Sequence, residues 1–168
     1  MLNETVEARL EAASGLAADH PILSLWRRND IINRAEASCE IAVLAPREPG
    51  AFTPPTRAAL ATRMARQCGS DALADRYEAL VSGGTADDEN IAHGSPVDWI
   101  IDAGLRAAAL HCDLLTLAPT SATRADIEAL REAGFADRDI VALSELIAFV
   151  NYHVRCVEGL RLIAEVRT

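Results

Sequence analysis

The chain has 168 residues, half of them hydrophobic, and a formal net charge of -9. This length fits one domain, and an acidic chain without a cluster of basic residues argues against nucleic acid and anionic membranes as partners. No apolar run approaches the roughly 20 residues of a membrane span and the N-terminus lacks a signal-peptide core, so we expect a cytoplasmic protein.

Helical spacing of apolar residues begins near the N-terminus. It predicts three helices, over residues 6–19, 21–28 and 30–45. The segment Pro46–Pro55, PREPGAFTPP, predicts a linker, because proline and glycine interrupt helices. Within it Thr53 is a helix N-cap that precedes two first-turn prolines. Residues 53–81 are therefore predicted to form a helix pair, broken at Gly69.

The next segment, residues 82–95, is acidic and glycine-rich and shows no periodicity. It predicts an exposed, mobile loop, with a lid over a pocket as the second interpretation. Ser95 and Asp98 have the spacing of a capping box, which predicts a long apolar helix from Val97 to Leu117.

The clearest helix start and stop signals lie in the last third of the chain. Thr123 and Asp126 resemble a capping box at the start of a short helix, which Gly134 ends in a left-handed conformation. A helix follows from Asp137 to Ile163 and is apolar on most of its circumference, as expected for the centre of a bundle.

These elements define the predicted fold class. No segment alternates with period 2, and the glycines and prolines fall between apolar helical runs, so the class is all-α. We expect about seven helices in a single domain over residues 1–168, with the core helices in residues 96–164. The four cysteines lie far apart in helical contexts, which is typical of small buried hydrophobes in a reducing compartment.

Two stretches carry a resemblance to a known family. The segment Leu115–Val141, and the run IAFVNYHVRCVEGL at Ile147–Leu160, resemble the AhpD-like superfamily (alkylhydroperoxidase D and carboxymuconolactone decarboxylase, CMD), in its peroxidase-related branch. The resemblance implies an AhpD-like multi-helix bundle, a CMD-type domain, and a homo-oligomer of closed symmetry. It fades in the first 20 residues and in residues 82–95.

The resemblance also implies where an active site would lie, and this chain departs from it there. Active members carry a glutamate, a CxxC pair at a helix N-terminus and a histidine, which together activate and resolve a thiol. With the family's glycine placed on Gly69, these positions become Ala58, Ser70, Leu73 and Tyr77. No two cysteines stand three residues apart, so a dithiol peroxidase of this kind is not expected and 53–81 is a degenerate active-site helix pair.

A second register places Cys68 on the first cysteine position. The remaining positions then become Thr56, Asp71 and Asp75, and acidic neighbours raise a thiol pKa. Cys68 lies near the helix break at Gly69, which makes it a candidate for a lone redox thiol, but a buried hydrophobe is the favoured interpretation.

Polar residues on the last helix form the other candidate site. Asn151, Arg155 and Glu158 share one stripe, which predicts either a buried polar cluster or a site where Arg155 holds a small anion, with Tyr77 lining the same cavity. His153 and Cys156 are three residues apart, but two ligands do not make a metal site, so neither a metal nor a cofactor is expected.

The sequence therefore favours an AhpD-like protein that has lost the dithiol site and acts as a small-ligand-binding or structural oligomeric subunit. The alternative is a divergent alkylhydroperoxidase or carboxymuconolactone decarboxylase-like enzyme. That alternative requires an enclosed pocket with Arg155 reachable and a histidine, His93 or His153, beside the ligand.

Overall fold

The computed structural model describes residues 6–166, with side chains from Leu10 onward. This part of the chain forms nine α-helices, two 3-10 helices and no strand, so the predicted all-α class is confirmed and the expected number of about seven helices was too low. Of the predicted domain 1–168, residues 1–5 and 167–168 lie outside the described residues.

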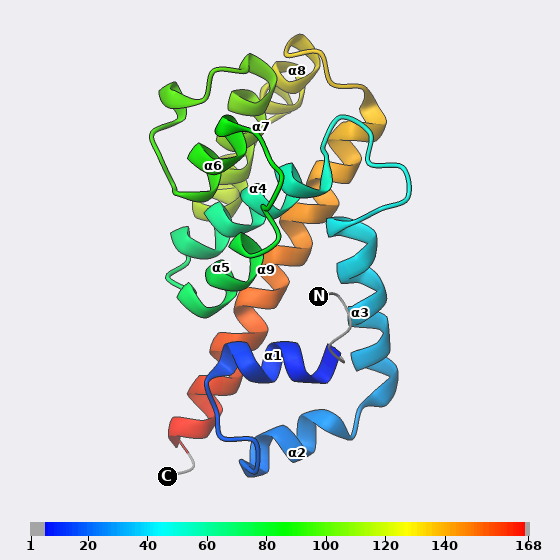
Figure 1. Cartoon of the computed structure of the whole chain (residues 1–168), viewed down its shortest axis with the longest axis vertical. Coiled ribbons are helices and arrows are strands. Elements are labelled where there is room, and N and C mark those ends of the chain that lie inside the picture. The colour runs from blue at the N-terminus through cyan, green and yellow to red at the C-terminus, as the bar shows by residue number, and fades with distance from the viewer. Residues whose placement is uncertain (1–5, 167–168) are drawn as a thin grey trace.

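The elements follow one another with short connections. They are α1 (Val6–Ser14), α2 (Pro21–Arg27), α3 (Asp30–Leu44), α4 (Pro54–Gln67), α5 (Asp71–Glu78), α6 (Ala86–Ala92), η1 (Val97–Trp99), α7 (Ala103–Leu117), η2 (Pro119–Ser121), α8 (Arg124–Glu132) and α9 (Asp137–Val166). Figure 1 shows α9 running along the molecule, with α4 to α8 gathered at one end and α1 and α2 near its C-terminal half.

Helix α4 lies at the centre of the bundle and contacts α3, α5, α6, α7 and α9. It begins as predicted at Thr53, whose hydroxyl accepts a hydrogen bond from the backbone N–H of Thr56 at 3.3 Å. Small side chains on several of its faces let neighbouring helices approach closely. The alanines buried completely or almost so are Ala58, Ala59, Ala61 and Ala65, and the larger Leu60 and Met64 are buried beside them.

The predicted linker before α4 is held in place by buried polar groups. The guanidinium of Arg57 donates to the backbone carbonyls of Phe52, Val43 and Pro49, each at 2.9 Å. The carboxylate of Asp139, at the start of α9, accepts from the backbone N–H of Ala51 at 3.1 Å. The end of α3, the linker and the starts of α4 and α9 are therefore tied together.

The prediction of an exposed loop over residues 82–95 is wrong for residues 86–92, where α6 forms. Thr85 and Asp88 make a complete capping box: Asp88 accepts from the Thr85 backbone N–H at 2.8 Å, and the Thr85 hydroxyl accepts from that of Asp88 at 3.2 Å. Ile91 and Ala92 are buried against the bundle. This burial explains why an acidic segment is helical.

The predicted helix from Val97 to Leu117 is shorter than expected. Ser95 and Asp98 do not cap it, and residues 97–99 form only the 3-10 helix η1. Helix α7 instead begins after Asp102, which accepts from the backbone N–H of Leu105 at 2.8 Å. The side chain of Ile101, just before α7, is exposed.

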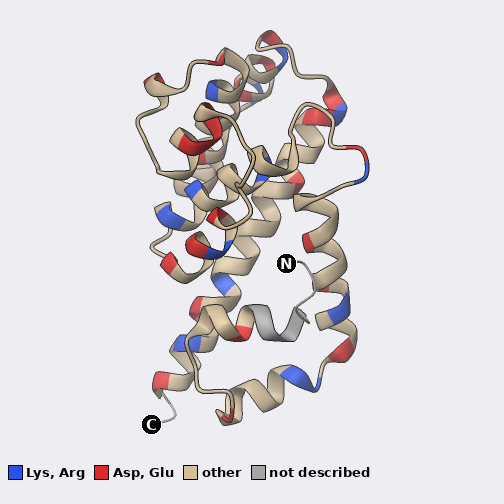
Figure 2. Ribbon diagram, viewed as in Figure 1, with Lys and Arg blue, Asp and Glu red and all other residues tan. Residues whose placement is uncertain are grey.

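The last third of the chain matches the prediction closely. Thr123 and Asp126 form a capping box at α8, Gly134 has φ +97°, and α9 begins at Asp137. Helix α9 is largely uncharged through its middle (Figure 2) and is long and apolar enough to cross a membrane by length and composition. More than half of its most apolar window is buried against neighbouring helices, and bundle-core helices share this composition.

One buried histidine lies between α7 and α8. His111 lines a groove of about 200 Å³, and neither ring nitrogen has a hydrogen-bond partner among the described residues. Burial lowers the pKa of His111, and the nearby carboxylate of Asp126 opposes this effect. The folded chain therefore holds this imidazole neutral where an exposed histidine would gain a proton.

This lowered pKa predicts a loss of stability in acid. As pH falls through about 6.5, the unfolded chain binds a proton that the folded chain does not, so the free energy of unfolding decreases. We expect His111→Leu to lose less stability than the unchanged protein between about pH 7.5 and pH 5, as measured by the melting temperature. His93→Gln, at an exposed position, is the control, and an equal loss in all three proteins would contradict the prediction.

Candidate functional site

The polar residues predicted on α9 do not form one cluster. Asn151 is buried, and its amide donates to the carbonyl of Ile147 at 3.0 Å. Arg155 and Glu158 are exposed: Arg155 donates to the Asn151 carbonyl at 2.9 Å, and Glu158 accepts from Arg161 at 2.7 Å. The prediction of a buried cluster is therefore wrong for Arg155 and Glu158, because this part of the stripe faces away from the bundle.

Tyr77 and His153 instead meet inside the molecule. The Tyr77 hydroxyl lies 2.8 Å from His153 Nδ1, and His153 Nε2 lies 2.7 Å from Glu36 Oε1. The three side chains come from α5, α9 and α3, and their exposed fractions are 0%, 2% and 5%. They form one buried chain of hydrogen bonds, which we call the Glu36–His153–Tyr77 chain.

The protonation of Tyr77 bears on which groups donate the hydrogen bonds in the Glu36–His153–Tyr77 chain. Burial raises the pKa of Tyr77 far above its usual value, with Glu40 and Glu36 adding to the rise and Arg76 opposing it. Tyr77 therefore stays protonated, and its hydroxyl can donate to His153 Nδ1 when that is the unprotonated ring nitrogen. The other nitrogen, Nε2, then carries the proton and donates to the Glu36 carboxylate.

A groove between α3 and α9 lies beside this chain. It has a volume of about 280 Å³ and is called here the α3–α9 groove. Its lining residues are Ala35, Glu36, Cys39, Ala148, Phe149 and Tyr152. The second carboxylate oxygen, Glu36 Oε2, is buried and has no hydrogen-bond partner in the part of the chain that the structure describes. An acceptor with unused capacity therefore lies at an apolar, aromatic groove.

Aromatic rings shield the Glu36–His153–Tyr77 chain from solvent on the side of the α3–α9 groove. The Phe149 ring centroid lies 4.2 Å from that of His153, with an interplanar angle of 49°. Tyr152 is partly exposed, and its ring lies 6.4 Å from that of Phe149. Water is thus kept from the imidazole, which strengthens its hydrogen bonds.

The cysteines are less buried than predicted. Cys39 and Cys68 are exposed, Cys156 is half-buried, and Cys112 is buried. Partial burial raises the pKa of Cys68, and the charge of Arg155 offsets part of this rise. Burial also raises the pKa of Cys156, which lies beside Tyr152 and near Glu36. These environments favour the thiol over the reactive thiolate.

The four residues at the positions that the family resemblance implied for an active site are all inaccessible to solvent. Ala58, Ser70, Leu73 and Tyr77 are fully or almost fully buried, and the hydroxyl of Ser70 has no hydrogen-bond partner among residues 10–166. The described residues contain no group of three or more histidine, cysteine or acidic side chains placed to hold a metal. Both nitrogens of His153 are occupied by Tyr77 and Glu36, so it is not available to share a metal with Cys156.

Sequence reasoning missed Glu36, the residue that joins this chain to the groove. Ile32 and Cys39 are seven residues apart, which is the spacing of one helix face, but the structure exposes both. The residues buried on α3 are Asn33, Glu36, Glu40, Val43 and Leu44. A stripe of Asn33, Glu36 and Glu40 at spacings of three and four was the available signal.

Comparison with known proteins supports the fold. The structure is similar to that of an uncharacterized peroxidase-related protein from Silicibacter sp. TM1040, with a TM-score of 0.65 and 21% sequence identity over 78% of this chain and 69% of that chain. No family model matches the sequence, and no curated protein matches it significantly. The chain therefore shares the all-α fold of that protein.

Proposed function

We propose that this chain is a small-ligand-binding protein that has lost the dithiol peroxidase chemistry of its fold. Its ligand lies in the α3–α9 groove and donates a hydrogen bond to Glu36 Oε2. The observation that carries the proposal is this buried carboxylate oxygen, which has no partner among the described residues although the other oxygen is paired with His153 at 2.7 Å. A buried acceptor without a partner is costly, and a ligand donor removes that cost.

The groove also indicates the chemistry of the ligand. Phe149 and Tyr152 offer aromatic surface, and Glu36 offers a negative acceptor, so an aromatic molecule with an ammonium or hydroxyl donor fits. Tyr152 lines the same groove as Glu36 and is partly exposed. Arg155 lines neither this groove nor the groove beside His111. The grooves therefore give no support to a decarboxylase-like site built on Arg155.

Three probes of equal size test the proposal: benzylamine, benzyl alcohol and benzoate, titrated by calorimetry. We expect benzylamine to bind most tightly and benzoate at least about tenfold more weakly, because Glu36 repels an anion. Glu36→Gln keeps the acceptor for His153 and should weaken benzylamine about ten- to hundredfold. Glu158→Gln, an exposed carboxylate on α9, is the matched control and should bind as the unchanged protein does.

Two results would contradict the proposal. Equal affinities for benzoate and benzylamine would show that Glu36 does not contact the charged group of the ligand. Turnover of tert-butyl hydroperoxide with dihydrolipoamide as reductant, abolished by Cys68→Ser, would show that thiol peroxidase activity persists. The peroxidase assay tests the exposed Cys68, so its outcome does not depend on the titration of ligands at the α3–α9 groove.

Self-association remains a prediction from the family resemblance. Exposed apolar side chains on α3, Ile31 and Ile41, favour it, since large exposed aliphatic groups are common at subunit contacts. Sedimentation velocity over a range of protein concentrations measures the subunit number directly.

A further inference from the structure

A third groove lies where α2, α3 and the C-terminal half of α9 meet, and is called here the α2 groove. Its volume is about 360 Å³, at the lower end of the roughly 300–1,000 Å³ of small-molecule sites. Its walls are largely apolar and include Ile22, Trp26, Leu160 and Ile163. No charged residue lines it in the part of the chain that the structure describes, in contrast to the α3–α9 groove with its Glu36.

Two polar atoms of opposite type belong to the lining residues of this groove. Asn33 is only 2% exposed, and its Oδ1 has no hydrogen-bond partner among the described residues; the same is true of Trp26 Nε1. The other amide atom of Asn33, Nδ2, donates to the Trp26 carbonyl at 3.3 Å, which fixes the orientation of the amide. The groove therefore offers one donor and one acceptor.

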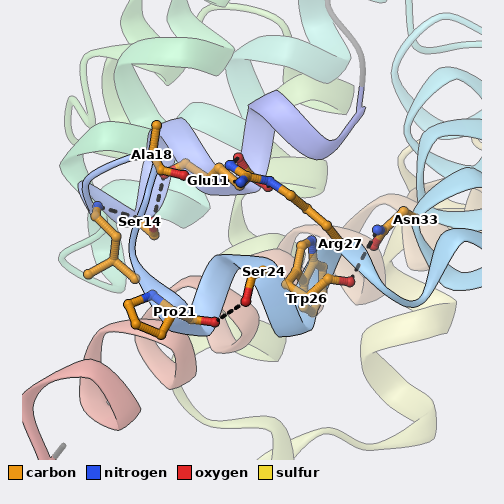
Figure 3. Close-up of polar contacts among 9 residues, drawn as sticks. Glu11, Ser14, Ala18, Pro21, Ser24, Trp26, Arg27 and Asn33 are labelled. Carbon is orange, nitrogen blue, oxygen red and sulfur yellow. Dashed lines mark hydrogen bonds and ion pairs between the residues drawn. The ribbon is translucent and has the colours of Figure 1, made fainter.

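The neighbouring contacts hold α2 in position, so that the groove is formed before any ligand arrives. Figure 3 shows the Arg27 side chain reaching from α2 to Glu11 and Ala18. Its Nε and Nη2 donate to the two Glu11 oxygens at 2.7 and 2.5 Å, and its Nη1 donates to the Ala18 carbonyl at 3.0 Å. Trp26, the preceding residue, is thereby fixed beside Asn33.

We propose that the α2 groove binds a neutral amphiphile. Its head group accepts a hydrogen bond from Trp26 Nε1 and donates one to Asn33 Oδ1, as an alcohol or a primary amide does, and its apolar body lies along Ile22, Leu160 and Ile163. Charged heads are excluded, because the lining holds no opposite charge to compensate for their desolvation. This site is separate from the ligand proposed at Glu36.

Trp26 provides a direct readout. The chain has two tryptophans, and Trp99 is 64% exposed, so Trp99→Phe leaves Trp26 as the single emitter. In this background we expect hexanamide and 1-hexanol to change Trp26 emission saturably, and hexanoate and hexylammonium to bind at least about tenfold more weakly. Asn33→Ala should weaken hexanamide about three- to tenfold, and Trp26→Phe, measured by calorimetry, should do the same.

A matched control distinguishes the amide itself from loss of any asparagine. The half-buried Asn90 also donates from its amide to a tryptophan carbonyl, that of Trp99, at 3.4 Å, and Asn90→Ala should leave hexanamide binding unchanged. Glu36→Gln should also leave it unchanged, which separates this site from the α3–α9 groove. Equal binding of charged and neutral probes would overturn the proposal. So would Trp26 emission that depends on protein concentration but not on hexanamide, because a second copy of the chain would then occupy the groove.

Discussion

Replacing Arg57 with methionine is expected to lower the free energy of unfolding by about 3–5 kcal/mol. The guanidinium satisfies the carbonyls of Val43, Pro49 and Phe52, and each buried acceptor left without a donor costs about 1–3 kcal/mol. Burial lowers the pKa of Arg57, while Asp139 and Glu145 act in the opposite direction, so the charge is supported by nearby carboxylates. Urea denaturation measures the change.

The control for this variant is another arginine on the surface. Arg124 pairs with Glu128 at an exposed i,i+4 position, and Arg124→Met should change stability by less than about 0.5 kcal/mol. Arg57→Lys should fall between the two, because a single ammonium does not reach three carbonyls. A loss below about 1 kcal/mol for Arg57→Met would mean that the linker is not held by this side chain.

The second large effect is expected for His153→Phe, which should lower the free energy of unfolding by about 3–5 kcal/mol. The change keeps a ring of similar size but removes the partner of the buried Glu36 carboxylate and of the Tyr77 hydroxyl. An unpaired buried charge is among the most destabilising changes in a protein interior. Tyr77→Phe, which removes one neutral hydrogen bond, should cost only about 1–2 kcal/mol.

A double variant separates the lost pairing from lost packing. Glu36→Leu combined with His153→Phe removes the stranded charge as well as its partner, so we expect it to be more stable than His153→Phe alone by more than about 1 kcal/mol. If the second substitution instead lowers stability further, the two side chains are not coupled and the hydrogen-bonded chain does not hold in solution.

Local signals with a strict spacing were reliable at most positions, although the Ser95–Asp98 spacing does not cap a helix. The Thr123–Asp126 capping box, the Thr53 N-cap and the turn at Gly134 are all present in the structure. The same capping spacing at Thr85–Asp88 marks α6 and could have been found, but the glycines and acidic residues around it favoured a loop.

The candidate site was harder to predict because it depends on contacts between distant helices. On α3 three of the buried residues are polar, and two of them have distant partners: Glu36 contacts His153, and Glu40 contacts Arg76 at 2.8 Å. A hydrophobic pattern places such residues outside, since it cannot foresee partners more than thirty residues away. For the same reason, Arg155 was predicted inside although its part of α9 faces solvent.

The most direct test of the account is nitrogen NMR of the histidine rings during titration with benzylamine. The chain has four histidines, and in this account only His153 is hydrogen-bonded to Glu36, the residue proposed to contact the ligand. We predict that its Nε2 resonance shifts saturably, that the rings of His20, His93 and His111 are unaffected, and that Glu36→Gln abolishes the response. Saturable benzylamine binding that leaves the His153 resonances unchanged would contradict the proposed site.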